Sequence, residues 1–369
     1  MKRVVLLGGG HAHALLLLQW ARRPTAGVQL YLVSPQPHSL YSGSVPGWLA
    51  GRCGAEALQI DLVSLCCAAG VRWLQGEAVA LDAPAKQLQL ASGEQLPFDL
   101  LSINTGSTLS PPAHPGPLLT LRPLNALVQA WPRWLADWRR GHGAANLDMV
   151  GGGAAGVEVL LAVLARLRAL RPDRGISPRL FAASERLLPG HPAAVARLAQ
   201  AELQAAGVEL RLGQRWQPGD SAATAHLLWA PGAQPPTWLA QSPLMLSADG
   251  YVAVNACLQS RSHPHVFAAG DSAALDPPLE KSGVRAVRMA PLLARNLRAA
   301  LAGEPLQPYH PQQAVLALLA LPDGRAIASR AGWPALQGRW VGRWKEFLDG
   351  RFMRQFHPEA LASLHPETP

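Results

Sequence analysis

Cysteines, acidic residues and long apolar runs are all scarce in this sequence. The four cysteines, Cys53, Cys66, Cys67 and Cys257, form no CxxC or CxxxxC spacing. We therefore expect no metal site and no redox-active dithiol, and this cysteine usage favours a reducing, cytoplasmic compartment. No apolar stretch reaches the roughly 20 residues of a membrane-spanning helix, so any membrane contact would be peripheral.

Basic residues outnumber acidic ones. The chain has 33 lysines and arginines against 24 acidic residues, a formal net charge of +9. This balance is typical of proteins that bind nucleic acid, an anionic membrane or an anionic cofactor, although an arginine-rich proteome gives the same composition. No Lys/Arg run resembles a nucleic-acid-binding patch, so we expect no nucleic-acid partner. The length of 369 residues predicts two or three domains.

A glycine-rich turn follows the first apolar segment. Residues 4–33 are typical of a strand, a helix and a second strand, which together predict a βαβ unit. In the turn, Gly8 permits a tight bend and Gly10 lets the backbone approach a pyrophosphate at the helix N-terminus. His13 replaces the third glycine of the dinucleotide motif, so a turn without a ligand is the alternative.

The same pattern recurs in the middle of the chain. A short strand ends at Val150, and Gly151, Gly153 and Gly156 then match the full G-x-G-x-x-G motif before a helix over residues 157–170. Two such units in one chain are typical of a protein that binds a flavin and a nicotinamide dinucleotide. We therefore predict an α/β fold with two Rossmann-like dinucleotide-binding domains and a C-terminal segment.

Both units lack the acidic residue that usually binds a dinucleotide ribose. The second strand of the first unit ends at Ser34, whose hydroxyl still offers a hydrogen bond without charge. The matching strand of the second unit ends near Ala182, which offers neither a carboxylate for NADH nor an arginine for the 2′-phosphate of NADPH. The sequence therefore leaves the choice between NADH and NADPH open.

Seven stretches resemble the FAD-dependent pyridine nucleotide-disulfide oxidoreductase superfamily, and together they span nearly the whole chain. They are residues 5–14, 41–47, 102–107, 229–233, 267–271, 281–288 and 338–353. Within the superfamily, the chain resembles the type II NADH dehydrogenase-like proteins associated with selenide, water dikinase. The resemblance implies a glutathione reductase-like FAD/NAD(P)-binding fold, FAD as the cofactor and NAD(P)H as the co-substrate.

The same resemblance, with a proline-rich boundary at residues 108–120, divides the chain. It implies a first part of the FAD-binding domain at 1–120, an inserted NAD(P)-binding domain at 121–245, a second part of the FAD-binding domain at 246–310 and a C-terminal segment at 311–369. Within the first part we expect a long functional loop over residues 35–54 and a helix over residues 58–69.

The resemblance also implies the residues of the site. The FAD contacts are Gly8, Gly10, His11, Ser34, Val79, Thr105, Gly106, Gly270 and Asp271, and the nicotinamide contacts are Gly151, Gly153 and Gly156. Two side chains are catalytic candidates. Lys281 would stabilise negative charge on the reduced flavin, unless it is a solvated surface lysine. Glu158 would line the nicotinamide–flavin interface, unless it is an ordinary acidic residue at a helix start.

Two departures from the superfamily restrict the chemistry. The CxxxxC of the disulfide reductases is absent and residues 41–47 stand in its place, so we expect no dithiol relay. Met289 replaces the glutamine that closes the A-x-x-Q pattern beside the flavin, which weakens the case for a quinone site. The resemblance implies that a hydride passes from NAD(P)H to flavin, and electrons then pass to a quinone or small-molecule acceptor. The alternatives are a flavoprotein partner of selenium metabolism and a flavin-binding module with a degenerate nicotinamide site.

Residues 338–356 predict a basic amphipathic helix. Its apolar residues are Trp340, Val341, Trp344, Phe347, Leu348, Phe352, Met353 and Phe356, and Arg339, Arg343, Lys345, Arg351 and Arg354 are interleaved with them. Such a helix favours peripheral contact with the inner face of a membrane. The alternatives are packing against the flavin domain and contact with a second copy in a homodimer.

Overall fold

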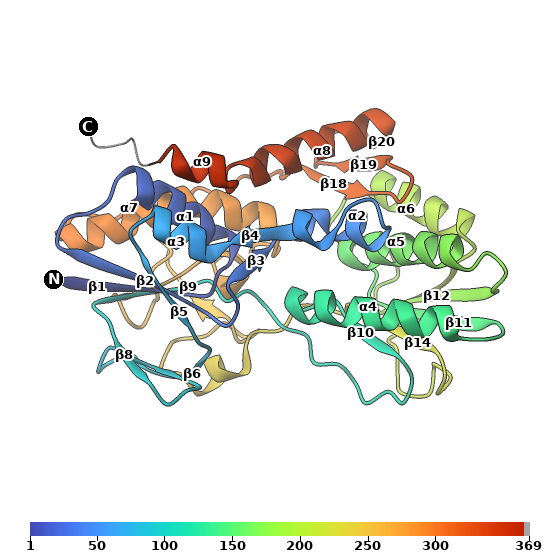
Figure 1. Ribbon diagram of the computed structural model, residues 1–369, viewed down its shortest axis with the longest axis horizontal. Helices are drawn as coiled ribbons and strands as arrows, with labels where there is room; N and C mark the ends of the chain where they lie inside the picture. The colour runs from blue at the N-terminus through green and yellow to red at the C-terminus, as the bar shows by residue number, and fades with distance from the viewer. Residues whose placement is uncertain (365–369) are drawn as a thin grey trace.

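A five-stranded parallel sheet forms the centre of one half of the molecule (Figure 1). The computed structural model describes residues 1–364. In spatial order the strands are β16 (Val266–Ala268), β9 (Leu100–Ile103), β1 (Lys2–Leu7), β2 (Val28–Ser34) and β5 (Arg72–Gln75). The four apolar residues at the end of β1 are all buried, as expected for the central strand of a parallel sheet that is covered on both faces.

Three helices pack beside this sheet: α1 (His11–Arg22), α3 (Leu62–Ala68) and α7 (Gly283–Ala302). Asp61 caps α3 by accepting a hydrogen bond from the backbone N–H of Ser64 at 3.0 Å, which fixes the start of the helix. The predicted helix over residues 58–69 is therefore wrong at its beginning, where the chain forms strand β4 (Gln59–Asp61).

The segment expected to be a long loop, residues 35–54, contains regular structure. Strand β3 (His38–Leu40) pairs with β4. The 3-10 helix η1 (Ser42–Ser44) and helix α2 (Val45–Leu49) follow within the segment, and the 3-10 helix η2 (Ala55–Leu58) begins directly after it. Val45, Trp48 and Leu49 are buried because α2 packs against helix α5 (Ala154–Leu170) of the other half. The loop prediction was wrong because a tertiary contact orders this segment, and no local pattern reports such a contact.

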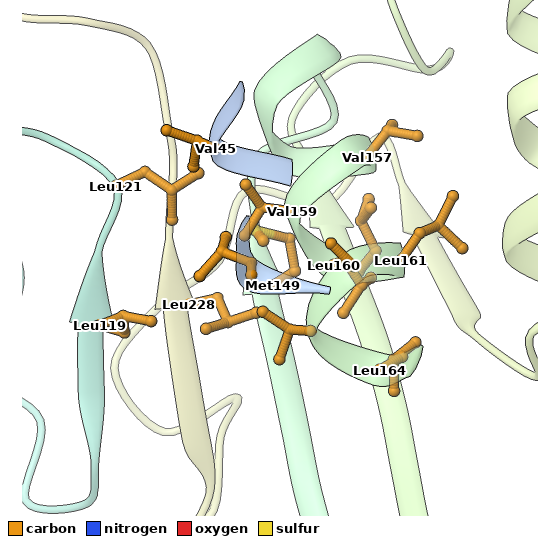
Figure 2. Close-up of a cluster of buried hydrophobic side chains, with 14 of the residues drawn as sticks. Val45, Leu119, Leu121, Met149, Val157, Val159, Leu160, Leu161, Leu164 and Leu228 are labelled. Atoms are coloured by element: carbon orange, nitrogen blue, oxygen red, sulfur yellow. The ribbon is translucent and has the colours of Figure 1, made fainter. Parts of the chain in front are cut away.

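A second five-stranded parallel sheet forms the centre of the other half. Its strands, in spatial order, are β10 (Leu118–Thr120), β14 (His226–Trp229), β11 (Ala145–Val150), β12 (Ile176–Ala182) and β13 (Glu209–Leu212), flanked by α4 (Leu124–Arg140), α5 and α6 (Ala193–Ala205). Figure 2 shows Met149 and Leu228 of the strands beside Val159 of α5, with Val45 of α2 reaching into the same cluster. Because β10 pairs with β14, the second sheet begins before the predicted boundary at residue 121.

Shorter elements complete the two halves. They are the antiparallel sheet of β6 (Ala78–Asp82), β7 (Gln87–Leu90) and β8 (Gln95–Pro97), the parallel pair β15 (Val252–Ala253) and β17 (Ala273–Ala274), and the 3-10 helices η3 (Thr237–Gln241) and η4 (Gly270–Ser272).

The C-terminal segment spans both halves. It consists of an antiparallel sheet, β18 (Ala317–Ala320), β19 (Ala326–Ser329) and β20 (Leu336–Gly338), followed by α8 (Arg339–Arg354) and α9 (Pro358–Ala362). The sheet contacts α5 and α6, α8 runs above α2, and α9 contacts α3 (Figure 1). The predicted α/β fold with two Rossmann-like domains is confirmed. None of the helices within residues 1–364 is long and apolar enough to cross a membrane.

Candidate functional site

The first glycine-rich turn joins β1 to α1 against the end of β9. Gly8 has a φ of +93°, and a side chain there would lie 2.5 Å from the backbone oxygen of Asn104. A side chain at Gly10 would collide with the side-chain oxygen of Asn104. Asn104 also donates to the backbone oxygen of Ala269 at 2.8 Å, so one side chain connects the ends of β9 and β16. Sequence reasoning missed Asn104, although it lies inside the matched stretch 102–107.

The two histidines of this turn have different environments. The ring of His13 is buried and lies 2.7 Å from the backbone oxygen of Gly8 and 2.8 Å from Ser102 Oγ, which is a packing role. Burial lowers the pKa of His13 to about 4. Burial also lowers the pKa of His11 to about 4, opposed by the Asp271 carboxylate. The Nε2 atom of His11 is buried and has no hydrogen-bond partner within residues 1–364.

Asp271 lies at the same sheet edge, directly after β16. Its Oδ2 accepts hydrogen bonds from Ser107 Oγ at 3.0 Å and from Arg122 Nη1 at 2.7 Å. Arg122 comes from the linker between β10 and α4, and no sequence motif points to it. Because β1, β9 and β16 are parallel neighbours, their carboxyl ends meet where a doubly wound sheet binds its ligand.

The remaining predicted flavin contacts lie around this edge. Thr105 Oγ1 and the backbone N–H of Gly106 lie 3.3 Å and 3.1 Å from Ser272 Oγ, beside Gly270 in η4. Ser34 already donates its hydroxyl hydrogen to the backbone oxygen of Gln36 at 2.7 Å. Val79 lies at a register shift in β6, outside the regular ladder. The roles of all these residues toward FAD stay predictions.

The Lys281 side chain contacts the backbone of residues 271–273. Its Nζ donates to the backbone oxygens of Asp271 at 2.7 Å and Ala273 at 3.0 Å, and it sits 3.5 Å from the ring centroid of Tyr251. Burial lowers the pKa of Lys281 to about 8. The structure therefore places this lysine in a partly buried position rather than in bulk solvent, and its contacts do not join it to Glu158.

The second glycine-rich turn joins β11 to α5. Gly151 has a φ of +124°, and a side chain there would collide with the backbone oxygen of Ala230. A side chain at Gly156 would likewise collide with the backbone oxygen of Gly151. Ala182, at the end of β12, is 3% exposed, and its methyl group lies against the backbone of Gly152. The second turn therefore has the tight geometry of a dinucleotide site, with no charged group at the strand end.

Both turns fit a dinucleotide pyrophosphate. Helices α1 and α5 begin after Gly10 and Gly153, and neither N-cap has a side-chain hydrogen bond in the described part of the chain. By contrast, side-chain oxygens of Asp61 and Ser282 cap α3 and α7. The first N–H groups of α5 and the positive ends of both helices are thus available to a phosphate, whereas in α1 the backbone N–H of His13 already donates to Asn104 Oδ1 at 3.3 Å. A methyl group at Gly153 would meet no atom within 4 Å, so the space beside this turn is open.

Glu158 lies two residues after the second turn, in α5. Its Oε1 accepts a hydrogen bond from the backbone N–H of Ala320 in β18 at 2.6 Å. Burial raises the pKa of Glu158 to about 7, the Lys345 ammonium lowers it, and the Asp349 carboxylate raises it. A carboxyl group that titrates near neutral pH can both hold and release a proton under physiological conditions.

Lys345 and Asp349 lie one turn apart on α8, and both form hydrogen bonds with the segment that contains Tyr41 and Gly43. Lys345 Nζ donates to Asp349 Oδ2 at 2.7 Å and to the backbone oxygen of Gly43 at 2.8 Å. The Tyr41 hydroxyl donates to Asp349 Oδ1 at 2.7 Å. Burial and then the Asp349 carboxylate raise the pKa of Tyr41 above its ordinary range, so the hydroxyl stays protonated. We call Tyr41, Lys345 and Asp349 the α8 cluster, and its two charged groups act on the pKa of Glu158.

Aromatic contacts connect the α8 cluster to the first turn. The Tyr41 ring stacks on Phe352 of α8 with a centroid distance of 4.8 Å and meets the edge of His11 at 5.6 Å. Tyr41 also lies over Gly43, where a methyl group would come within 2.7 Å of the hydroxyl oxygen. The contacts of Tyr41 therefore reach the start of α1, while Glu158 in α5 is held by β18.

Comparisons with known proteins agree with this geometry. The sequence model of the pyridine nucleotide-disulphide oxidoreductase family matches residues 2–292. An NADH dehydrogenase-like protein of Mycobacterium tuberculosis is 28% identical over 305 residues, which cover 74% of this chain and 73% of that protein. The sulfide:quinone oxidoreductase of Aquifex aeolicus has a TM-score of 0.79 at 17% identity, with 100% of this chain and 93% of that chain covered. NDH2 of Plasmodium falciparum, solved with NADH, has a TM-score of 0.74 at 12% identity, with 96% and 98% covered.

Proposed function

This chain belongs to the pyridine nucleotide-disulphide oxidoreductase family, and from that premise we propose that it passes electrons from NAD(P)H, by way of FAD, to a quinone in a membrane. The chain is an FAD-dependent NAD(P)H oxidoreductase, with FAD as cofactor and NAD(P)H as co-substrate. The quinone and the membrane are the proposed parts. The name of one structurally similar protein, a sulfide:quinone oxidoreductase, contains the quinone, and the exposed face of α8 supports the membrane.

The exposed face of α8 is the observation that carries the proposal. Trp340, Phe347 and Leu348 are 50%, 57% and 37% exposed, and Arg343 and Arg351 lie exposed on the same helix. Aromatic and basic side chains on one helix face favour the interface of an anionic membrane. The opposite side of α8 carries Lys345, Asp349 and Phe352, and Phe352 meets the edge of the His11 ring, so a quinone in the bilayer would meet the helix that contacts the first dinucleotide turn.

Each part of the site has a task in this proposal. The turn at Gly8 and the start of α1 would hold the FAD pyrophosphate, and Asp271, fixed by Arg122, would hold the ribityl region. The turn at Gly151 would hold the nicotinamide nucleotide beside Glu158. When bound, FAD would supply the chemistry that converts a two-electron hydride donor into an electron source for the acceptor.

Two features restrict how the acceptor is reduced. The four cysteines are free, and none lies in residues 41–47, which supports electron transfer without a redox-active disulfide. Met289 is buried and its sulfur accepts the backbone N–H of Gly270 at 3.2 Å, so quinone recognition would fall to the α8 side. The association with selenide, water dikinase stays a prediction, which co-purification of the two proteins would test.

The experiment is oxidation of NADH and NADPH by the purified flavoprotein with a short-chain ubiquinone analogue, with and without anionic phospholipid vesicles. We expect quinone-dependent oxidation and co-sedimentation with the vesicles. The double variant Trp340→Ser/Phe347→Ser should lose co-sedimentation. Trp333→Ser is the matched control, because Trp333 is 42% exposed but lies outside α8. Oxidation that does not depend on quinone would contradict the acceptor, and equal sedimentation of all three proteins would contradict the membrane contact.

A further inference from the structure

The fold buries one side-chain nitrogen of the first dinucleotide turn without a partner. The Nε2 atom of His11 is buried and has no hydrogen-bond partner within residues 1–364. The rings of Tyr41 and Phe352 meet the His11 ring at centroid distances of 5.6 Å and 5.8 Å. A methyl group at Gly283, where α7 begins, would lie 4.0 Å from Nδ1. Because an unpaired polar atom costs free energy when it is buried, this nitrogen indicates a ligand-binding role rather than a packing role.

The position of His11 indicates which ligand group it meets. It is the first residue of α1, directly after Gly10, so its side chain starts at the helix end where a dinucleotide pyrophosphate binds. One backbone donor of that end is already used, because the N–H of His13 donates to Asn104 Oδ1 at 3.3 Å. In α5 the corresponding first residue is Ala154, which has no side-chain donor. The first turn therefore differs from the second by one ring nitrogen that can donate to a phosphate oxygen.

We propose that the His11 imidazole binds the FAD pyrophosphate in its protonated form, so that the protein takes up one proton when it binds FAD. The proton comes from water and adds to the ring nitrogen that carries no hydrogen, and no covalent bond of FAD changes. An imidazolium and the pyrophosphate dianion form a charge-assisted hydrogen bond, which is stronger than a bond between neutral groups. The proposal goes beyond the proposed function, because it requires FAD but neither a quinone nor a membrane.

The groups around His11 favour the neutral ring until FAD binds. Burial lowers the pKa of His11 to about 4, while the Asp271 carboxylate raises it and the Arg122 guanidinium lowers it. Arg122 donates to Asp271 at 2.7 Å, so the nearby negative charge is already paired. The rings that contact His11 are uncharged, because Phe352 is apolar and the Tyr41 hydroxyl stays protonated, and α7 faces it with a glycine. A phosphate dianion beside the ring favours the charged form and raises the pKa of His11.

The linkage between proton and cofactor sets the sign of the effect. Between the pKa of His11 in the free protein, about 4, and its higher pKa in the holoprotein, FAD binds more tightly as the pH falls. Within that window the dissociation constant for FAD should rise by about tenfold per pH unit, because one proton is bound with each FAD. The protein therefore retains its flavin more firmly at acidic than at alkaline pH.

The test is the dissociation constant for FAD, measured from the recovery of free-flavin fluorescence when the purified holoprotein is diluted at a series of pH values from about 5 to about 8. The wild type should release FAD more readily as the pH rises. His11→Gln keeps an N–H donor but cannot take up a proton. Its dissociation constant should therefore stay constant and exceed the wild-type value by about tenfold or more at the acidic end. His310→Gln, at an exposed position, is the matched control and should follow the wild type.

A second measurement needs no variant. Heteronuclear NMR of the histidine rings, compared at about pH 6 before and after the wild type is loaded with FAD, should show that one neutral ring becomes an imidazolium. The proposal is overturned if no ring gains a proton, or if the dissociation constant of His11→Gln varies with pH as steeply as that of the wild type. Both measurements use oxidised flavin without nucleotide or acceptor. Their failure would therefore remove the role of His11 and leave the proposed function standing.

Discussion

Replacing Glu158 with glutamine should remove a pH-dependent loss of stability. Burial raises the pKa of this carboxyl from 4.5 to about 7, so the folded protein favours its protonated form. A group with a raised folded-state pKa contributes stability below its unfolded pKa, and this contribution is lost as the pH rises through the folded pKa. The wild-type free energy of unfolding should therefore fall between about pH 4.5 and pH 7, in part because of this one residue.

The magnitude follows from the two pKa values. They differ by about 2.5, and each pKa unit corresponds to about 1.4 kcal/mol, so the full effect is about 3 kcal/mol. Because Glu158 is only partly buried, solvent screening makes this figure an upper bound. Glutamine keeps the size of the side chain and an oxygen that accepts the Ala320 N–H, so the variant should lose the pH dependence without losing the contact.

The assay is urea unfolding of the holoprotein at a series of pH values from about 4 to about 9, chosen to bracket the two pKa values. Glu158→Gln should match the wild type at the acidic end and be more stable at the alkaline end. Glu94→Gln, at an exposed position of the β7–β8 turn, is the control and should follow the wild type throughout. A Glu158→Gln variant whose stability falls with pH as steeply as the wild type would refute the reasoning.

Three further predictions concern the cofactor, the cysteines and the nucleotide. Asp271→Ala should lower FAD occupancy and leave Arg122 without its carboxylate partner, and full occupancy measured from the flavin absorption would contradict the assignment. A variant with all four cysteines changed to serine should keep its rate of flavin reduction, and a loss above about tenfold, roughly 1.4 kcal/mol of barrier, would show that a cysteine takes part. The wild type should discriminate weakly between NADH and NADPH because Ala182 bears no polar group, and Ala182→Glu should favour NADH. A wild-type preference for either nucleotide above about a hundredfold, roughly 2.7 kcal/mol, would show that another residue contacts the ribose and discriminates between NADH and NADPH.

The sequence was sufficient for the two Rossmann-like units because their signals are local. The turn at Gly151 needs a backbone that only glycine adopts without strain, and apolar strands precede each turn at a fixed distance. Asp271 could be named as a candidate because it lies within a short matched stretch. These features depend on neighbours in the chain, so periodicity and spacing report them directly.

The α8 cluster could not be predicted because its contacts are not local. Tyr41 and Asp349 lie 308 positions apart, and Lys345 reaches the backbone of Gly43 across 302 positions. The amphipathic pattern of α8 correctly indicated a helix, but the pattern treats Lys345 as one more exposed basic residue. Figure 1 shows α8 lying above α2, and the Lys345 side chain is only 12% exposed, which no local pattern reports.

The environments of Lys281 and Glu158 could not be predicted either, because they also depend on segments that are distant in sequence. The resemblance assigns both to catalysis, yet the structure ties Lys281 to the backbone behind Asp271 and ties Glu158 to β18. Burial, which sets the pKa of each group, depends on segments that lie far away in sequence. A role for Lys281 at the flavin therefore stays a prediction, whereas the contacts of Glu158 give it a defined place beside the second turn.

Anaerobic stopped-flow mixing of the FAD-loaded protein with NADH and, separately, with NADPH tests the central claim most directly. The account predicts that the visible flavin absorption bleaches with at least one of the two nucleotides, without any added thiol. Subsequent mixing with a short-chain quinone analogue should restore the oxidised spectrum. An FAD-loaded, folded protein whose flavin stays oxidised with both nucleotides would contradict the claim that this chain is an NAD(P)H-dependent flavin oxidoreductase.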